Sequence, residues 1–155
     1  MGKEIERKYL VHHQKWQQLH KPTGLLYRQG YLLTDPNKII RVRLTPTNAF
    51  LTIKGLSIGA TRAEYEYEIP LEEAKELLDQ FSISELSKTR YIIDYDNKTW
   101  EVDEFLGDNI GLIVAEIELT SEAEIFGIPP WIDREVTAEE KYYNSNLTIN
   151  PYKNW

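Results

Sequence analysis

Charged side chains recur at every second position in several short segments of this chain, and they are the residues best suited to chemistry. On an extended strand, residues two positions apart point to the same face. Carboxylates gathered on one face can bind a divalent metal, and Lys and Arg can grip phosphate oxygens. The charged residues spaced in this way are Glu4, Glu6, Lys8, Arg41, Arg43, Arg62, Glu64, Glu66, Glu68, Lys88, Arg90, Glu101, Asp103, Glu116 and Glu118, with Lys54 alone on its segment.

This alternation has an ordinary explanation, because antiparallel sheets often expose one face to water. Apolar residues at helical spacing in 71–81 favour a different explanation, because they predict a helix with an apolar face. Such a helix needs an apolar surface to cover, and the apolar strand faces supply one. Eight strands can close into a barrel that holds side chains or one small ligand. The charged faces would then point inward, where acids, bases, metal and phosphate must compensate one another.

The elements that must position these residues are mostly strands. Alternating β-branched and aromatic residues bounded by turn residues predict strands at 2–10, 25–34, 38–46, 49–55, 61–69, 87–95, 98–106 and 112–120. Helical spacing predicts helices over 71–81 and 13–20, and Thr137-Ala138-Glu139-Glu140 has the capping-box pattern that begins a third. We therefore expect an α+β, mainly β fold: a closed eight-stranded antiparallel barrel, with helices packed outside, in a single domain over 1–155.

Composition narrows the possible classes of function. The 155 residues are 41% hydrophobic and 28% charged, which is typical of one soluble globular domain. A net charge of −7 argues against a partner such as duplex nucleic acid, yet it allows a small phosphorylated ligand in a locally basic site. Without cysteine, disulfides and thiolate-bound metals are excluded. The chain has no apolar stretch near the roughly 20 residues of a membrane span, so we expect a cytoplasmic protein without a membrane partner.

The charged motifs, taken in order, resemble those of the CYTH superfamily, also called triphosphate tunnel metalloenzymes. The opening Glu4-Ile5-Glu6-Arg7-Lys8 is similar to the family's E-x-E-x-K signature, which taken alone is common on exposed strands. The motifs that follow are Gln29-Gly30-Tyr31-Leu32, Arg41-Val42-Arg43, Thr52-Ile53-Lys54-Gly55, Glu64-Tyr65-Glu66-Tyr67-Glu68-Ile69-Pro70, Lys88-Thr89-Arg90, Trp100-Glu101-Val102-Asp103, Ala115-Glu116-Ile117-Glu118-Leu119 and Glu135-Val136-Thr137. The length resembles the short bacterial-type members, although Ala138 and Lys141 stand where these often carry Gly and Arg.

The resemblance implies that bases hold a triphosphate while acids hold Mg²⁺ or Mn²⁺. The implied substrate-binding residues are Lys8, Arg41, Arg43, Lys54, Lys88 and Arg90. The implied primary metal ligands are Glu4, Glu6 and Glu118. The acids that hold a second metal, position water or orient the bases are Glu64, Glu66, Asp103 and Glu116. We count all these acids, with Lys8 and Lys54, as candidate catalytic residues, and we expect Glu68, Glu101 and Arg62 at the rim or behind the first ligands.

The expected activity is metal-dependent hydrolysis of a small polyphosphate, with inorganic tripolyphosphate as the favoured substrate and nucleoside triphosphates as a side activity. Two alternatives stay open. The first is a class IV adenylate cyclase or a thiamine triphosphatase, which share the tunnel. The second is a polyphosphate-binding module without turnover, and the many carboxylates argue against it because a pure anion binder gains little from acids beside its ligand. The sequence leaves the oligomeric state and the general base open.

Overall fold

The computed structural model describes residues 2–155, and its strands form one antiparallel sheet. The strands are β1 (Glu4–Val11), β2 (Leu25–Asp35), β3 (Lys38–Leu44), β4 (Ala49–Lys54), β5 (Thr61–Arg62), β6 (Glu64–Ile69), β7 (Ser84–Tyr95), β8 (Lys98–Phe105), β9 (Ile113–Glu118) and β10 (Ile132–Glu135). Their order across the sheet is β10-β1-β9-β8-β7-β2-β3-β4-β6, with β5 pairing with β1. The mainly antiparallel β fold predicted from the sequence is confirmed.

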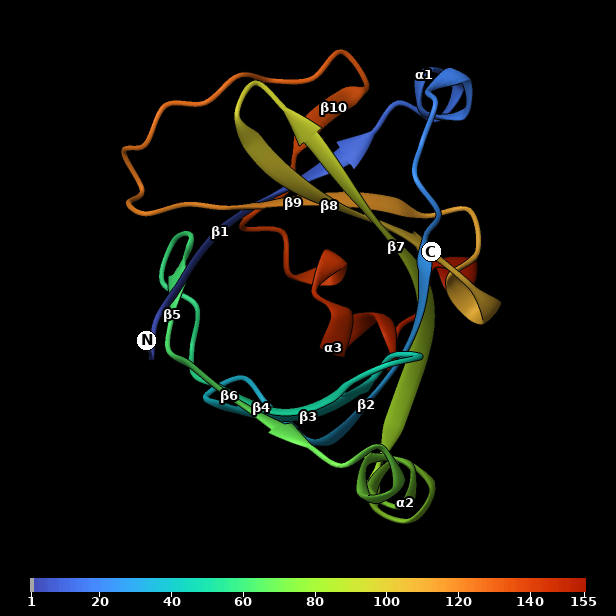
Figure 1. Cartoon of the computed structure of the whole chain (residues 1–155). Coiled ribbons are helices and arrows are strands. Elements are labelled where there is room, and N and C mark those ends of the chain that lie inside the picture. The colour runs from blue at the N-terminus through green and yellow to red at the C-terminus, as the bar shows by residue number, and fades with distance from the viewer. Residues whose placement is uncertain (1) are drawn as a thin grey trace.

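The sheet curls into a ring because one segment pairs with strands at both of its ends. β5 pairs with β1 through Glu4↔Arg62 and Ile5↔Thr61, and β6 continues the same segment alongside β4. Figure 1 shows the strands arranged in a ring, with β1, β8 and β9 facing β2, β3, β4 and β6 across it. Taken together, β5 and β6 correspond to the predicted strand 61–69, so all eight predicted strands contribute to the ring. The sequence did not predict β10, which pairs with β1 beyond the ring.

Two helices cover the outside of the ring, α1 (His13–Gln18) and α2 (Leu71–Phe81). The prediction of both helices is confirmed. α2 buries Ala74 and Leu78 in one apolar cluster with Val42 and Ala49. Gly30 of β2 allows this close packing, because a Cβ atom there would lie only 2.6 Å from Leu78 Cδ2.

A second apolar cluster lies under α1 and is built mainly from aromatic rings. Trp16 of α1 is fully buried, and its ring meets that of Trp131 edge to face at 5.4 Å. Trp100 of β8 contacts Trp131 and Tyr9 in the same manner. The apolar strand faces are therefore covered from outside, which leaves the charged faces pointing into the ring, as the sequence predicts.

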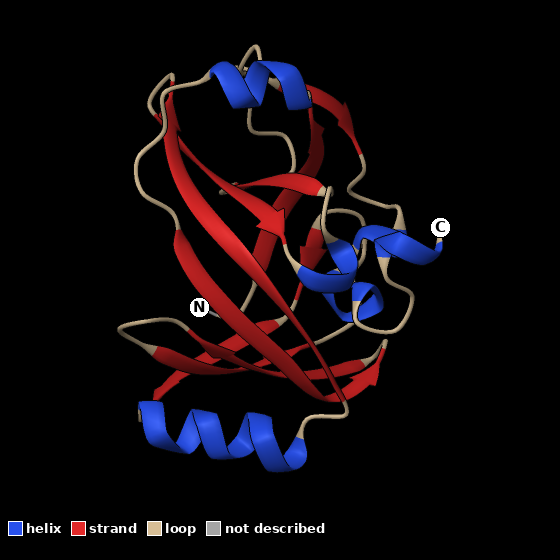
Figure 2. Cartoon of the chain, turned by 90° about the vertical axis from the view of Figure 1, so that its right-hand side faces the viewer, coloured by secondary structure: helices blue, strands red, loops and turns tan. Residues whose placement is uncertain are grey.

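The C-terminal segment crosses one end of the ring, seen inside it in Figure 1 and to one side of the sheet in Figure 2. It contains helix α3 (Asn144–Leu147) and the 3₁₀ turns Glu140–Tyr142 and Tyr152–Asn154; another 3₁₀ turn spans Gly107–Asn109. The predicted helix start at Thr137 is wrong. The Thr137 hydroxyl instead accepts a hydrogen bond from the Lys8 backbone N at 3.0 Å and donates to Glu135 Oε2, and the next helical turn begins only at Glu140. Within 2–155, no helix is long and apolar enough to cross a membrane.

Candidate active site

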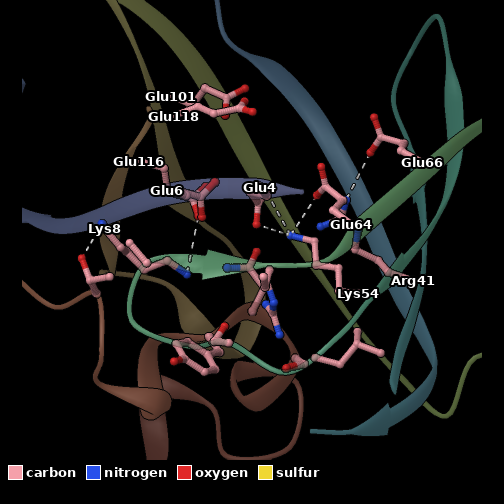
Figure 3. Close-up of a pocket in the computed structure, with 18 of the residues that line it drawn as sticks. Glu4, Glu6, Lys8, Arg41, Lys54, Glu64, Glu66, Glu101, Glu116 and Glu118 are labelled. Atoms are coloured by element: carbon pink, nitrogen blue, oxygen red, sulfur yellow. Dashed lines mark hydrogen bonds and ion pairs between the residues drawn. The ribbon is translucent and has the colours of Figure 1, made fainter. Parts of the chain in front are cut away.

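The inward faces of the strands line a cavity of about 200 Å³ whose walls are mostly charged side chains. Every site residue predicted from the sequence lines it except Asp103, and both Arg62 and Glu101 line it as well. Figure 3 shows these side chains converging from strands on opposite sides of the ring. Two-residue periodicity thus selected the residues that share this cavity.

The acids meet because β1, β8 and β9 are neighbours. Glu6 lies directly opposite Glu118 in the register of β1 and β9, and Glu116 lies opposite Glu101 in that of β9 and β8. Like charges in such positions destabilise a sheet. One carboxylate oxygen each from Glu6, Glu101 and Glu116 lies within 4.8 Å of the others. This arrangement calls for a positive partner, and oxygen donors of this kind suit Mg²⁺ or Mn²⁺.

The pKa values of the acids reflect how unequally they are compensated. Burial raises the pKa of Glu6 well above its usual range, and the nearby charges of Glu116 and Glu4 add to this effect. Burial also acts to raise the pKa of Glu116, but Lys8 at 3.5 Å and Arg90 at 3.1 Å help to hold it well below its usual range. Within the described part of the chain, Glu6 has no Lys, Arg or His nitrogen within 4.0 Å. Glu6 is therefore the acid most in need of a cation.

Asp103 stands behind the bases rather than at the cavity wall. It is 1% exposed, and its two oxygens accept hydrogen bonds from Arg90 Nε at 2.8 Å and Arg90 Nη2 at 2.9 Å. Lys88 Nζ lies 2.8 Å from Asp103 Oδ2. Of the roles weighed for Asp103, this position suits the orientation of bases.

Two of the bases have lowered pKa values because they are deeply buried. Burial lowers the pKa of Lys88 to about 7 despite the opposing effect of Asp103. Burial, with Arg41 and Arg90 nearby, lowers the pKa of Arg43 to about 10. Among residues 2–155, Arg43 has no carboxylate oxygen within 4.0 Å, and its guanidinium lies 5.1 Å from the centre of the Tyr27 ring. A buried cation without a carboxylate partner, as Arg43 is, favours an anionic ligand.

Lys54 connects the two halves of the cavity, whereas Arg41 pairs with an acid of its own half. Lys54 Nζ lies 3.2 Å from Glu4 Oε1 and 3.3 Å from Glu64 Oε2, as Figure 3 shows. Arg41 Nη2 lies 3.5 Å from Glu66 Oε2. These acids and bases therefore compensate one another in pairs.

The structure refines the expectations for the three residues placed at the rim. Glu101 is the fourth residue of β8 rather than a strand end, and its carboxylate lies 3.1 Å from Arg90 Nη1. Arg62 lines the cavity while its Nε donates to the Gly55 carbonyl oxygen at 3.2 Å. Glu68 is exposed and accepts a hydrogen bond from Asn48 Nδ2, away from the cavity. The two-residue spacing from Glu101 to Asp103 was the signal that placed Glu101 on the inner face.

Sequence reasoning missed several uncharged residues that line the cavity, and Tyr143, Asn144 and Ser145 are consecutive among them. These three belong to the C-terminal segment, where neither strand periodicity nor a charge pattern marks them. Only the path of that segment across the end of the ring brings them to the site.

Comparison with known proteins gives consistent matches over nearly the whole chain. The model of the CYTH domain family matches residues 2–149. An inorganic triphosphatase of Acetivibrio thermocellus is 51% identical over 156 residues, covering 100% of this chain and 99% of the relative. An inorganic triphosphatase of Nitrosomonas europaea is 36% identical, covering 95% and 97%. The crystal structure of an inorganic triphosphatase superposes with a TM-score of 0.65 at 33% identity, covering 94% of each chain.

Proposed function

Because this chain belongs to the CYTH domain family, we propose that it hydrolyses a small polyphosphate, with inorganic tripolyphosphate as its substrate. The observation that carries the proposal is the cavity itself, where bases from around the ring face a group of acids. The relatives named inorganic triphosphatase support the same activity, since one of them matches this chain over its full length. Phosphoanhydride hydrolysis depends mainly on positioning and charge stabilisation, which such a cavity can provide.

The size of the cavity favours an inorganic substrate. Its volume of about 200 Å³ is below the roughly 300–1,000 Å³ typical of sites that enclose drug-sized ligands. A compact polyphosphate can lie among the charged walls, whereas the organic part of a nucleotide or of thiamine triphosphate would have to remain outside. The adenylate cyclase and thiamine triphosphatase alternatives therefore gain no support from the site.

In this proposal the bases hold the phosphates in the ground state and in the transition state. The side chains assigned to this role are Lys8, Arg41, Arg43, Lys54, Arg62, Lys88 and Arg90. Arg forks can bind phosphate oxygens bidentately, and Lys acts as a compact charge. Arg43, which has no carboxylate oxygen within 4.0 Å among residues 2–155, is well suited to bind phosphate oxygens.

The acids would hold the divalent metal, and their oxygen donors fit Mg²⁺ or Mn²⁺. Glu6, Glu101 and Glu116 would provide one group of ligands, because their oxygens already lie within 4.8 Å of one another. The cavity also offers Glu4 and Glu118 as primary ligands, with Glu64 and Glu66 available for a second metal. When bound, the metal supplies charge neutralisation at the phosphoryl oxygens and a water of lowered pKa.

The test is a phosphate-release panel over tripolyphosphate, ATP, thiamine triphosphate and long-chain polyphosphate, each with Mg²⁺ or Mn²⁺. We expect tripolyphosphate to give the highest kcat/KM and no release without metal. Tight calorimetric binding of tripolyphosphate without phosphate release under any of these conditions would identify a binding module instead.

A further inference from the structure

One hydrogen-bonded chain links Arg43 and Lys88 through two uncharged side chains. Arg43 Nε donates to Gln29 Oε1 at 3.1 Å, and Gln29 Nε2 donates to Asn144 Oδ1 at 2.9 Å. The same Asn144 oxygen accepts a hydrogen bond from Lys88 Nζ at 2.7 Å. Gln29 is fully buried, and its Nε2 also donates to the Tyr31 hydroxyl at 3.0 Å. The chain thus joins β2, β3 and β7 to the C-terminal segment.

The orientation of the Gln29 amide follows from its neighbours. Arg43 offers only donors, so the Gln29 oxygen must face it. Asn144 then presents its own oxygen to two donors, Gln29 Nε2 and Lys88 Nζ. A reversed amide at Gln29 would set donor against donor at Arg43, inside a buried site where such an error is costly.

These hydrogen bonds occupy only some of the nitrogen donors of Arg43 and Lys88 and leave the other donors free for a ligand. Arg43 is held through Nε, so its two terminal nitrogens keep the fork that binds phosphate bidentately. Lys88 is held by Asp103 and Asn144, which take two of the three ammonium donors and leave one. Both bases are therefore fixed in place and still have N–H donors available for a ligand.

We propose that Gln29 and Asn144 are positioning residues for the substrate, setting Arg43 and Lys88 in the geometry that grips it. This inference rests on the proposed function. Because Asn144 belongs to α3, docking of the C-terminal segment is part of assembling the substrate site, although Asn144 adds no charge. Lys8 supports the same conclusion, since its Nζ donates to the Tyr142 carbonyl oxygen at 3.4 Å.

The experiment compares Asn144→Ala and Gln29→Met with the wild type. We expect KM for tripolyphosphate to rise roughly 10- to 100-fold in each, the change expected from losing a hydrogen bond to a charged group. The value of kcat should change far less, because these bases bind the phosphates in both the ground and the transition states. Asn146→Ala is the matched control, since Asn146 lies on the same helix but donates to the Glu140 carbonyl oxygen away from the cavity.

Two further variants keep the test decisive. Gln29→Met combined with Asn144→Ala should cost less than the sum of the single changes, because both residues act through one chain. Asn144→Asp keeps the size and the acceptor oxygen but places a negative charge beside Lys88, so we expect it also to raise KM. This isosteric variant replaces Asn144→Ala in the comparison if the alanine variant does not fold.

An unchanged KM in Gln29→Met and Asn144→Asp would overturn the proposal, as would an equal rise in Asn146→Ala. If the wild-type protein releases no phosphate from tripolyphosphate with either Mg²⁺ or Mn²⁺, the proposed function is contradicted but the positioning roles are not. Those roles are then judged from the calorimetric Kd for tripolyphosphate in the same set of variants.

Discussion

Single residues in this cavity differ in how fully their charge is compensated, and Glu6 is an extreme case. Burial and the neighbouring acids raise its pKa, so its charge costs stability until a metal balances it. We predict that Glu6→Gln lowers turnover of tripolyphosphate by about 10²- to 10³-fold, the typical cost of losing one group that stabilises developing charge. The melting temperature should stay level or rise, because the variant removes a repulsive charge while keeping the size.

The measurement pairs phosphate release at saturating Mg²⁺ with thermal unfolding. Glu68→Gln is the control, because Glu68 is exposed and outside the cavity. Near-normal turnover in Glu6→Gln would show that Glu6 holds no essential metal.

Lys88 gives the pH-dependent prediction at the same scale. Its pKa is lowered to about 7, so at pH 8 it is mostly uncharged in the free protein. A bound polyanion favours the charged ammonium and raises this pKa, so binding of tripolyphosphate at pH 8 should take up a proton. Calorimetry without metal, in two buffers of different ionisation enthalpy, measures this uptake. We expect Lys88→Met to lose most of it, and equal uptake in the two proteins would rule out Lys88 as its source.

At the scale of elements, the ring depends on close contact between β2 and α2. Gly30→Ala should destabilise the protein by about 1–3 kcal/mol, as overpacking of a tight core does. The added methyl group would meet Leu78 Cδ2 at 2.6 Å and Ser82 Cβ at 3.0 Å. Denaturant unfolding measures the loss, while KM should be retained because residue 30 faces away from the cavity. In a Leu78→Ala background the same change should cost less, and an equal cost there would place the strain elsewhere.

The molecule as a whole combines an acidic net charge of −7 with clustered bases inside the ring. Ligand binding to the folded state alone stabilises it, by about 2.7 kcal/mol at a concentration of 100 times Kd. For a protein of this size that corresponds to a rise in melting temperature of roughly 5–10 °C. We predict this shift with tripolyphosphate in the absence of metal. Orthophosphate at equal concentration is the control, and a shift of equal size would contradict binding of a longer anion.

Much of the site follows from the sequence because strand alternation is a local property. Residues such as Arg41 and Arg43 share a face wherever their strand lies, so inward charge could be predicted before any strand was paired. The turn at Asp96-Asn97 is similarly local, and both residues adopt the left-handed conformation with φ of 49° and 62°. The single-domain organisation over 1–155 stays a prediction.

The tertiary structure decided which charges meet. Register between β1 and β9, which are far apart in sequence, set Glu6 against Glu118, and register between the consecutive strands β8 and β9 set Glu101 against Glu116. Alternation along a single strand does not encode such pairings. Asn144 became part of the site only because the C-terminal segment crosses the end of the ring, where its amide meets Gln29 and Lys88. Local alternation therefore determined the chemistry that lines the cavity, whereas long-range pairing determined its arrangement.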